Sequence, residues 1–488
     1  MPISPLTRSP QQIHNCCLTR TDEKPVQFDS RLWEPSQTTV PKRLERSVIY
    51  FQAPAQSEST SQLWRIGELY LAQKEVVGAQ LWKPLNQIAD WEGFSMRWDP
   101  TKSHWPRDLR ILRDGYGSSK TSLIPVQGIM DSTKLLDRLK KVMANSLQCA
   151  PVLLSCKHHN LKSKVMHRLD AGRNQIVMSR CYFEGGNVLK AELNEQPVYL
   201  VGAANLWASV LIFHEIIHGH EIDSIPWRNE LVEAVLDFQD GCNASDLSRD
   251  KQQQMLDFLF KAQEIPSSEG SKENLDRLSE FLALFQVAKK FMEEDFGVPC
   301  VFAGYEEGLN CIQLNFHLDF YMTCLPGGVV LLQDHQKCIE VLKKLVRNQT
   351  LMWKERELFK LMEVSARGLI DSCKEPLNQL ELQLKKKGFH VLRVPGHFQL
   401  SPTQTILNFM NSVVFVSGND SRTCIILPKY GATGEIRLRQ AFVECLEEAQ
   451  VGRTWILGPE TAGENIFSES LAYDGSLRCQ TIERYSSS

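Results

Sequence analysis

Residues 316–333 read Phe-His-Leu-Asp-Phe-Tyr-Met-Thr-Cys-Leu-Pro-Gly-Gly-Val-Val-Leu-Leu-Gln, and they say more about the architecture than any other stretch of the chain. The segment around His317 and Asp319 is strand-like, and a period of two would direct both side chains to one face. A second apolar run follows the glycines at residues 328–333. The stretch therefore predicts two successive strands, with His317 and Asp319 together on the first.

Short apolar runs alternate with amphipathic stretches over most of the chain, as strands and helices do in βα units. Further strands are expected at residues 47–51, 389–394, 412–417 and 423–428, and another short apolar run lies at residues 109–112. Helices are expected at residues 134–144, 353–387 and 436–449. The predicted fold class is therefore α/β.

Composition divides the chain into four expected segments. Residues 1–44 are rich in Ser, Thr, Pro and Gln and are expected to form a flexible N-terminal extension. Residues 230–296 carry apolar side chains at helical spacing with few strand candidates, which predicts an inserted helical subdomain. Residues 45–229 and 297–488 are then the first and second parts of one β/α fold.

Charge and composition exclude several classes of partner. The 488 residues include 55 basic and 58 acidic side chains, so the net charge of -3 offers no broad attraction to nucleic acid or an anionic membrane. The 14 cysteines lack the spacing of a disulfide framework or a zinc site. No apolar run approaches the ~20 residues of a membrane span, and the N-terminus lacks a secretory signal. We expect a cytoplasmic protein.

Four short motifs carry the residue types needed to react with a guanidinium carbon. Such chemistry requires a soft nucleophile, a proton shuttle, and carboxylates that pair with the planar cation. Besides His317-Leu318-Asp319, the motifs are Trp105-Pro106-Arg107-Asp108, Phe183-Glu184-Gly185-Gly186-Asn187-Val188-Leu189 and Gly475-Ser476-Leu477-Arg478-Cys479-Gln480-Thr481. The double glycine would let backbone approach a ligand closely beside a carboxylate.

The order Asp, Glu-Gly-Gly, His-x-Asp, Cys resembles that of the guanidino-group-modifying enzyme superfamily. This superfamily includes arginine deiminases, agmatine deiminases, dimethylarginine hydrolases, amidinotransferases and peptidyl-arginine deiminases. The resemblance extends over residues 100–482 and covers all four motifs. It implies a five-bladed, pseudo-symmetric β/α propeller with the active site at its centre, without a cofactor or a metal.

The resemblance also implies a role for each motif residue. Cys479 would attack the guanidinium carbon, His317 would act as general acid and base, and Glu184 would orient His317. The implied substrate-binding residues are Asp108, Asp319 and Asn187. The implied reaction is hydrolysis through a covalent thiouronium intermediate, giving a ureido product.

One departure from the family pattern affects the expected substrate. Arginine deiminases typically carry Glu-Arg-Thr after the Val-Gly strand, whereas here Val201-Gly202 runs into Ala203-Ala204-Asn205. This favours a guanidino small molecule without a carboxylate, or a peptidyl arginine, over free arginine. Amidino transfer by the same site is the alternative reaction, and the oligomeric state is open.

Two alternatives come from other classes of protein. His214-Glu215-Ile216-Ile217-His218 matches the HExxH pattern of a zinc peptidase, in which four-residue spacing puts both imidazoles on one helical face. Glu221 or Glu233 could supply a third zinc ligand. The other alternative is a non-catalytic propeller that only binds a partner, against which the retention of every core chemical group argues.

Overall fold

The structure is a computed structural model of the whole chain, which divides into two units. One unit comprises Met1–Phe51 with Glu460–Ala462, and the other comprises Gln52–Pro459 with Gly463–Ser488. The residues described below all belong to the second unit. They are 64–72, 74–99, 107, 110–113, 121–125, 175–218, 225–239, 241–253, 256, 272–304, 317–348, 351–401, 404–458, 467 and 476–485.

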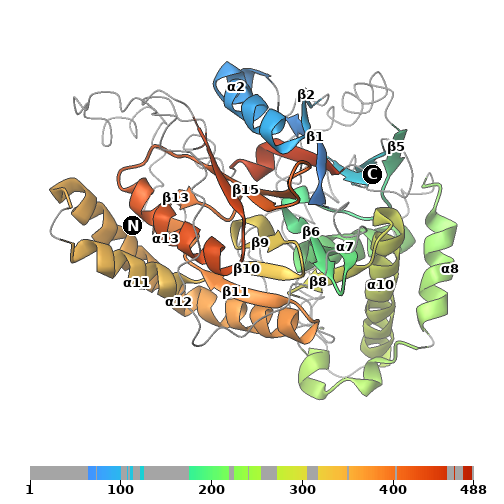
Figure 1. The fold of residues 1–488 in the computed structure, drawn as a ribbon. Coiled ribbons are helices and arrows are strands. Elements are labelled where there is room, and N and C mark those ends of the chain that lie inside the picture. The colour runs from blue at the N-terminus through green and yellow to red at the C-terminus, as the bar shows by residue number, and fades with distance from the viewer. Residues whose placement is uncertain are drawn as a thin grey trace, which may run out of the picture. The chain divides into compact units, whose positions relative to one another are not determined.

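The described residues form five three-stranded sheets of the same topology (Figure 1). In spatial order across the sheet, the first sheet contains β17 (Thr481–Tyr485), β1 (Ile66–Leu71) and β2 (Ser95–Trp98), so the last strand of the chain pairs with the first. The other four sheets contain β3 (Ile111–Arg113), β4 (Thr121–Ile124) and β5 (Gln175–Met178); β6 (Val188–Leu193), β7 (Gln196–Gly202) and β8 (Cys300–Ala303); β9 (Met322–Leu325), β10 (Val329–Gln333) and β11 (His390–Val394); and β14 (Val413–Val416), β15 (Thr423–Pro428) and β16 (Arg453–Leu457). The first pair in every sheet is antiparallel and the second pair is parallel. A separate hairpin joins β12 (His397–Ser401) to β13 (Gln404–Asn408).

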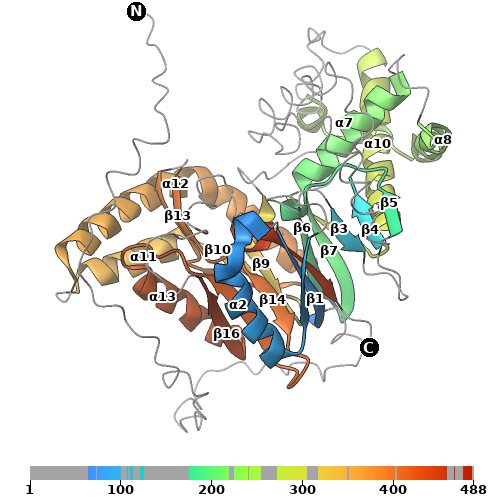
Figure 2. The same ribbon diagram turned by 90° about the horizontal axis from the view of Figure 1, so that it is seen from above.

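In four of the five sheets, described helices connect the parallel strands, because a parallel pair needs a long crossover whereas an antiparallel pair can be joined by a tight turn. The crossover helices are α2 (Lys74–Glu92) before β2; α7 (Ala203–His218), α8 (Arg228–Gln239) and α10 (Lys272–Phe296) before β8; α11 (His335–Val346) and α12 (Trp353–Lys386) before β11; and α13 (Glu435–Glu448) before β16. Figure 2 shows α11 and α12 lying side by side. None of the helices that the structure describes is long and apolar enough to cross a membrane.

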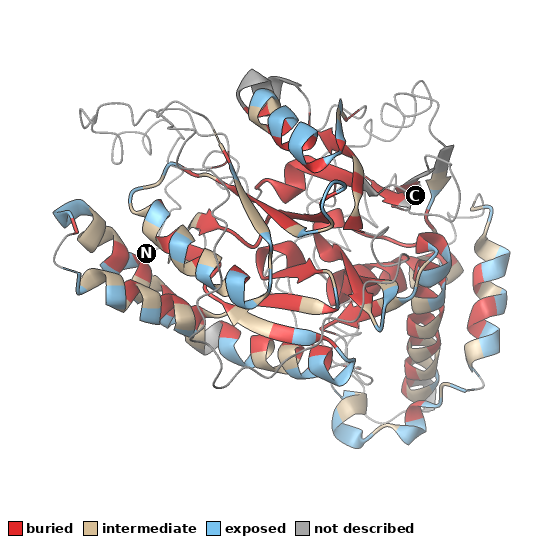
Figure 3. Ribbon diagram, in the orientation of Figure 1, coloured by how far each residue is buried: buried red, intermediate tan, exposed pale blue. Residues whose placement is uncertain are grey.

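Two large clusters of buried apolar side chains pack against these sheets. Figure 3 shows the buried residues in red. The larger core includes residues of β1, β9–β11 and β14–β16 and of helices α2, α11, α12 and α13. The second core is formed mainly by α7, α8 and α10 against β5–β8. Every residue of α7 from Ala203 to Phe213 is buried, and Asn205 and Ser209 are the polar residues in this stretch.

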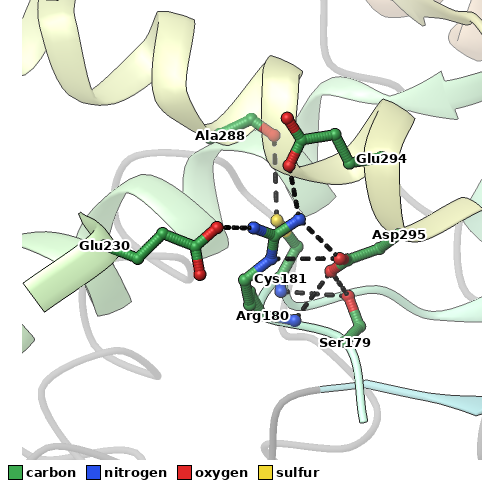
Figure 4. Close-up of polar contacts among 7 residues, drawn as sticks. All are labelled: Ser179, Arg180, Cys181, Glu230, Ala288, Glu294 and Asp295. Carbon is green, nitrogen blue, oxygen red and sulfur yellow. Dashed lines mark hydrogen bonds and ion pairs between the residues drawn. The ribbon is translucent and has the colours of Figure 1, made fainter. Parts of the chain in front are cut away.

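A partly exposed cluster of charges around Arg180 ties this second core together (Figure 4). The guanidinium forms ion pairs with Glu230 of α8 and with Glu294 and Asp295 of α10, the last two at 2.7 and 2.8 Å. It also lies 3.8 Å from the centre of the Phe291 ring. Since Arg180 follows β5, the cluster fastens two helices to the end of one sheet.

Most of the strands and helices expected from the sequence are present among the described residues. The strands expected at 328–333, 389–394, 412–417 and 423–428 and the helices expected at 353–387 and 436–449 are confirmed, with bounds that differ by at most one residue. Residues 111 and 112 of the apolar run at 109–112 belong to β3. The elements expected at 47–51 and 134–144 lie outside the described residues, as does the extension at 1–44. The helices α8 and α10 occupy most of the segment 230–296, and its status as an insertion stays a prediction.

The prediction that His317 and Asp319 lie on a strand is wrong. Residues Leu318–Phe320 form a single 3₁₀ turn, closed by hydrogen bonds from Phe320 N to His317 O at 3.1 Å and from Tyr321 N to Leu318 O at 2.9 Å. The strand β9 begins only at Met322. His317 and Asp319, which are two positions apart, therefore lie on a turn that precedes the strand and not on one face of a strand.

Candidate active site

The predicted motif residues lie on short turns that immediately precede the first strand of a sheet. The 3₁₀ turn Gly185–Asn187 precedes β6, the turn Leu318–Phe320 precedes β9, and the turn Arg478–Gln480 precedes β17. In the other two sheets, Arg107 precedes β3 and the loop from Phe409 to Ser412 precedes β14. Since β3, β6, β9, β14 and β17 hold equivalent places in their sheets, the four described turns and Arg107 hold equivalent positions as well.

Successive turns contact one another in a ring. Gly185 packs against the backbone of Arg107, and Asn187 Oδ1 accepts a hydrogen bond from Leu318 N at 3.1 Å. Thr323 Oγ1 donates to Met410 O, and Asn411 Oδ1 accepts from Arg478 N at 2.8 Å. Arg107 Nε donates to Arg478 O at 3.0 Å, which closes the ring. Every link joins one turn, or the strand that follows it, to the next. Motif residues that lie far apart in the sequence are thereby linked to one another.

His317 and Glu184 form the most direct link between two motifs. Nε2 of the imidazole lies 2.7 Å from Glu184 Oε2, and both side chains are almost fully buried. The other carboxylate oxygen accepts a hydrogen bond from the Tyr182 hydroxyl at 2.5 Å. A carboxylate held from both sides fixes the orientation of the imidazole, as a general acid and base requires.

The two glycines of the Glu-Gly-Gly motif are required by close packing within the protein. A β-carbon on Gly186 would lie 2.2 Å from His317 Nδ1, and one on Gly185 would lie 2.2 Å from Arg107 O. The sequence suggested that these glycines make room for a ligand. Instead, they admit the histidine ring and the neighbouring turn.

Residues of α7 hold the backbone of Glu184. Asn205 Oδ1 accepts a hydrogen bond from Glu184 N at 3.2 Å. Ser209 Oγ, one helical turn later, accepts from Tyr182 N at 3.0 Å. The Ala203-Ala204-Asn205 sequence, where the family pattern would have Glu-Arg-Thr, therefore positions the motif carboxylate in this chain.

Cys479 lies between Asp319 and Asn411. Its sulphur is 3.7 Å from Asp319 Oδ2 and 3.3 Å from Asn411 Nδ2. All three side chains are buried. The sulphur thus faces a carboxylate that could pair with a cation and an amide that can only donate to it.

Several neighbours fix the turn that carries Cys479. The Tyr430 hydroxyl donates a hydrogen bond to Asn408 O at 2.7 Å and accepts one from Ser476 Oγ at 2.6 Å. On the other side, Arg107 donates to the carbonyl of Arg478 and forms a buried ion pair with Glu483. The turn that carries Cys479 is therefore held by hydrogen bonds on both sides.

Two buried carboxyl groups near this turn have pKa values shifted in opposite directions. Burial raises the pKa of Asp319 above its ordinary value, although the charges of His317 and Arg478 act against this rise. For Glu483, burial also acts to raise the pKa, but Arg107 and Arg478 outweigh it and hold the pKa below its ordinary value. Glu483 is thus a permanent counter-ion, whereas Asp319 can change its protonation state when a cation binds.

The placement of the six predicted site residues is as follows. Glu184, His317, Asp319 and Cys479 lie together on the ring of turns. Asn187 lies on the same ring, where its side-chain oxygen is used by Leu318 N. Asp108 lies outside the described residues, although its neighbour Arg107 takes part in the ring. Their roles in binding and catalysis remain proposals.

Sequence reasoning missed Tyr182, Asn205, Asn411 and the structural role of Arg107. A signal for Asn411 was present, because Asn408-Phe409-Met410-Asn411 comes directly before an expected strand, as the His317 motif also does. An asparagine without a family motif around it carries no chemical signal of its own.

The HExxH residues lie on α7. The rings of His214 and His218 are 4.6 Å apart, His214 stacks on Phe281, and His218 Nε2 lies 2.6 Å from Glu280 Oε1. Of the suggested third ligands, Glu221 lies outside the described residues and Glu233 is exposed on α8. Within the described part of the chain, no group of three or more His, Cys, Asp or Glu side chains could hold a metal ion.

Comparison with known proteins gives weak likenesses. No model of a protein family matches the chain, and no curated protein matches its sequence. Among solved structures, the chain is similar to C. jejuni agmatine deiminase, with a TM-score of 0.38 and 12% identity over 87% of this chain and 95% of that one. A cysteine-to-serine variant of the same enzyme with substrate bound gives a TM-score of 0.37 and 11% identity over the same shares.

Proposed function

We propose that this chain is a cysteine-dependent hydrolase of guanidino compounds, with Cys479 as nucleophile. The observation that carries the proposal is the position of the Cys479 sulphur, 3.7 Å from Asp319 and on the same ring of turns as the paired His317 and Glu184. Nucleophile, proton carrier and cation-binding carboxylate are the three groups that the reaction needs. We also propose that the five sheets are the blades of a β/α propeller around this ring.

The proposed reaction has two stages. The Cys479 thiolate attacks the guanidinium carbon, and His317 gives its proton to the departing nitrogen, which leaves a thiouronium on the sulphur. His317 then takes a proton from water, the hydroxide adds to the same carbon, and the carbon–sulphur bond breaks. The net change converts a guanidinium and water into a ureido compound and ammonium.

Asp319 and Asp108 are proposed to pair with the guanidinium nitrogens, and Asn187 to lie beside the substrate. The raised pKa of Asp319 fits this role, because a buried carboxyl group that is costly to ionise alone becomes easy to ionise beside a cation. Burial at 0% exposure also removes the competing water.

The test is incubation with arginine, agmatine, a methylated arginine and an arginine peptide, followed by assay for ureido product and ammonia. A second set of reactions contains an amine acceptor, since transfer of the amidino group would require one. Activity should survive a metal chelator and be lost to iodoacetamide, whereas a zinc peptidase would behave in the opposite way. Absence of product and of any cysteine adduct with all four substrates would contradict the proposal.

A further inference from the structure

The fifth turn of the ring carries no residue that the sequence motifs predicted, yet it reaches the proposed nucleophile. Asn411 lies just before β14, which runs beside β9 (Figure 2). The equivalent turns before β6, β9 and β17 carry Glu184, the His317 motif and Cys479. Asn411 thus occupies the place in its sheet that proposed catalytic residues occupy in three others.

The orientation of the Asn411 amide follows from its own hydrogen bonds. Its Oδ1 accepts from Arg478 N at 2.8 Å and from Cys479 N at 3.4 Å. Two backbone donors can only be satisfied by the oxygen of an amide, so Nδ2 must face the other way. That nitrogen lies 3.3 Å from the Cys479 sulphur.

This contact depends on the ionisation state of the sulphur. An amide NH₂ donates and cannot accept, so it leaves the sulphur to act as acceptor. A thiolate accepts a hydrogen bond more strongly than a thiol, because donors to charged groups contribute about twice as much as donors to neutral ones. The carboxylate of Asp319 lies 3.7 Å from the same sulphur, and when it is ionised its negative charge destabilises the thiolate.

We propose that Asn411 is a catalytic residue that donates a hydrogen bond to the Cys479 sulphur and thereby stabilises the thiolate in its attacking position. The proposal rests on the proposed function for the identity of the nucleophile. The proposal adds that the reactivity of Cys479 depends on Asn411 even when no substrate is bound.

The experiment measures alkylation of Cys479 by iodoacetamide as a function of pH. In this reaction the thiol loses its proton to solvent, and the thiolate forms a carbon–sulphur bond while iodide leaves. Trypsin cuts after Arg478 and Arg484, so the peptide from Cys479 to Arg484 contains this cysteine alone and mass spectrometry can follow it separately.

Two variants remove the donor in different ways. Asn411→Leu is similar in shape but lacks both polar atoms, whereas Asn411→Asp keeps the two backbone hydrogen bonds and should fold even if the leucine variant does not. Either should move the midpoint of the alkylation profile up by about one pH unit or more, which is about tenfold slower labelling below the midpoint. An unchanged profile in Asn411→Asp would overturn the proposal.

A matched control variant distinguishes the hydrogen bond to the Cys479 sulphur from the anchoring of the turn that carries it. Tyr430→Phe removes the hydroxyl that bonds to Ser476 and Asn408, and so loosens the same turn without touching the sulphur. Its alkylation profile should keep the wild-type midpoint. A shift as large as that of Asn411→Leu would mean that Asn411 merely anchors the turn. Failure of guanidine hydrolysis would leave this result intact, whereas a wild-type Cys479 that is never labelled would overturn both proposals.

Discussion

The ring of His317 packs so closely over Gly186 that a single methyl group cannot fit between them. A β-carbon on Gly186 would lie 2.2 Å from Nδ1 and 2.7 Å from Cγ of the imidazole. Both atoms belong to a rigid ring whose far side is fixed by Glu184. The glycine is therefore coupled directly to the position of the proposed general acid and base.

The first prediction follows from this packing. Gly186→Ala should displace the His317 ring, destabilise the protein by about 1–3 kcal/mol through overpacking, and reduce turnover by at least about a hundredfold. Gly368→Ala on α12 is the control, because a β-carbon there meets no atom within 4 Å. Its alanine should stabilise the helix by about 0.5–1 kcal/mol without affecting turnover. Urea unfolding and a kinetic assay measure both effects, and equal behaviour of the two variants would refute the prediction.

The second prediction concerns the effect of the Asp319 charge on the free energy of unfolding. Because the folded protein raises the pKa of this carboxyl group, the folded state binds its proton more tightly than the unfolded state does. Stability is therefore lost as pH rises from the unfolded pKa near 3.8 through the folded pKa, and the loss persists at neutral pH. Asp319→Asn should stabilise the protein at pH 7 by roughly 0.5–2 kcal/mol while abolishing turnover. The two proteins should converge in stability below the unfolded pKa, and a less stable variant at pH 7 would contradict the prediction.

Much of the local structure follows from the sequence, because strands and helices with buried faces leave a periodic pattern. The strands β10, β11, β14 and β15 and the helices α12 and α13 are of this kind. The four motifs also pointed to residues that lie on one ring of turns. Both successes depend on signals that are local in the chain.

The sequence does not predict the turns or the residues that contact them. Residues 316–320 have the composition of a strand, and only the hydrogen bond from Leu318 N to Asn187 shows why they turn instead. The side chain of Asn187 comes from 131 residues earlier, so no local pattern encodes this contact. Asn411 was missed for the same reason, because its importance depends on proximity to Cys479 across 68 residues.

The third prediction concerns two buried histidines close to the turn of Asp319. Burial lowers the pKa of His335 to about 4, partly opposed by Asp334 and assisted by Arg393, and lowers the pKa of His397 to about 3. His397 packs edge-on against Phe320, the residue after Asp319.

Since the unfolded histidines bind protons near pH 6.5, stability should be complete above that pH and fall progressively as pH drops toward 4 and 3. Each group should contribute a loss of about 1.4 kcal/mol per pH unit in this window. The double variant His335→Gln, His397→Gln should show a flatter dependence in urea unfolding between pH 7 and pH 4.5. Parallel curves for the two proteins would exclude this origin of acid sensitivity.

The fourth prediction assigns a positioning role to Tyr182. Tyr182→Phe removes the hydrogen bond to Glu184 and should lower kcat about tenfold, as expected for an orienting bond worth about 1.4 kcal/mol. It should also change the pH profile of kcat, because Glu184 orients the group that titrates. Tyr70→Phe is a matched control, since Tyr70 also donates to a glutamate two residues away, Glu68 at 3.0 Å, but outside the site. A common change in both pH profiles would mean that the effect is structural.

The last prediction separates the roles of Cys479 and His317. Cys479→Ser should lower turnover by about a thousandfold or more, because a hydroxyl is a much poorer nucleophile, while substrate binding survives. His317→Ala should allow attack but stall the proton transfers, so the covalent adduct should accumulate on Cys479. Intact mass after mixing each variant with substrate measures the adduct, and peptide mapping locates it. Full turnover in Cys479→Ser would overturn the mechanism. An adduct on Cys324, a buried thiol of β9 whose pKa burial raises to about 12, would show that the nucleophile is a different cysteine.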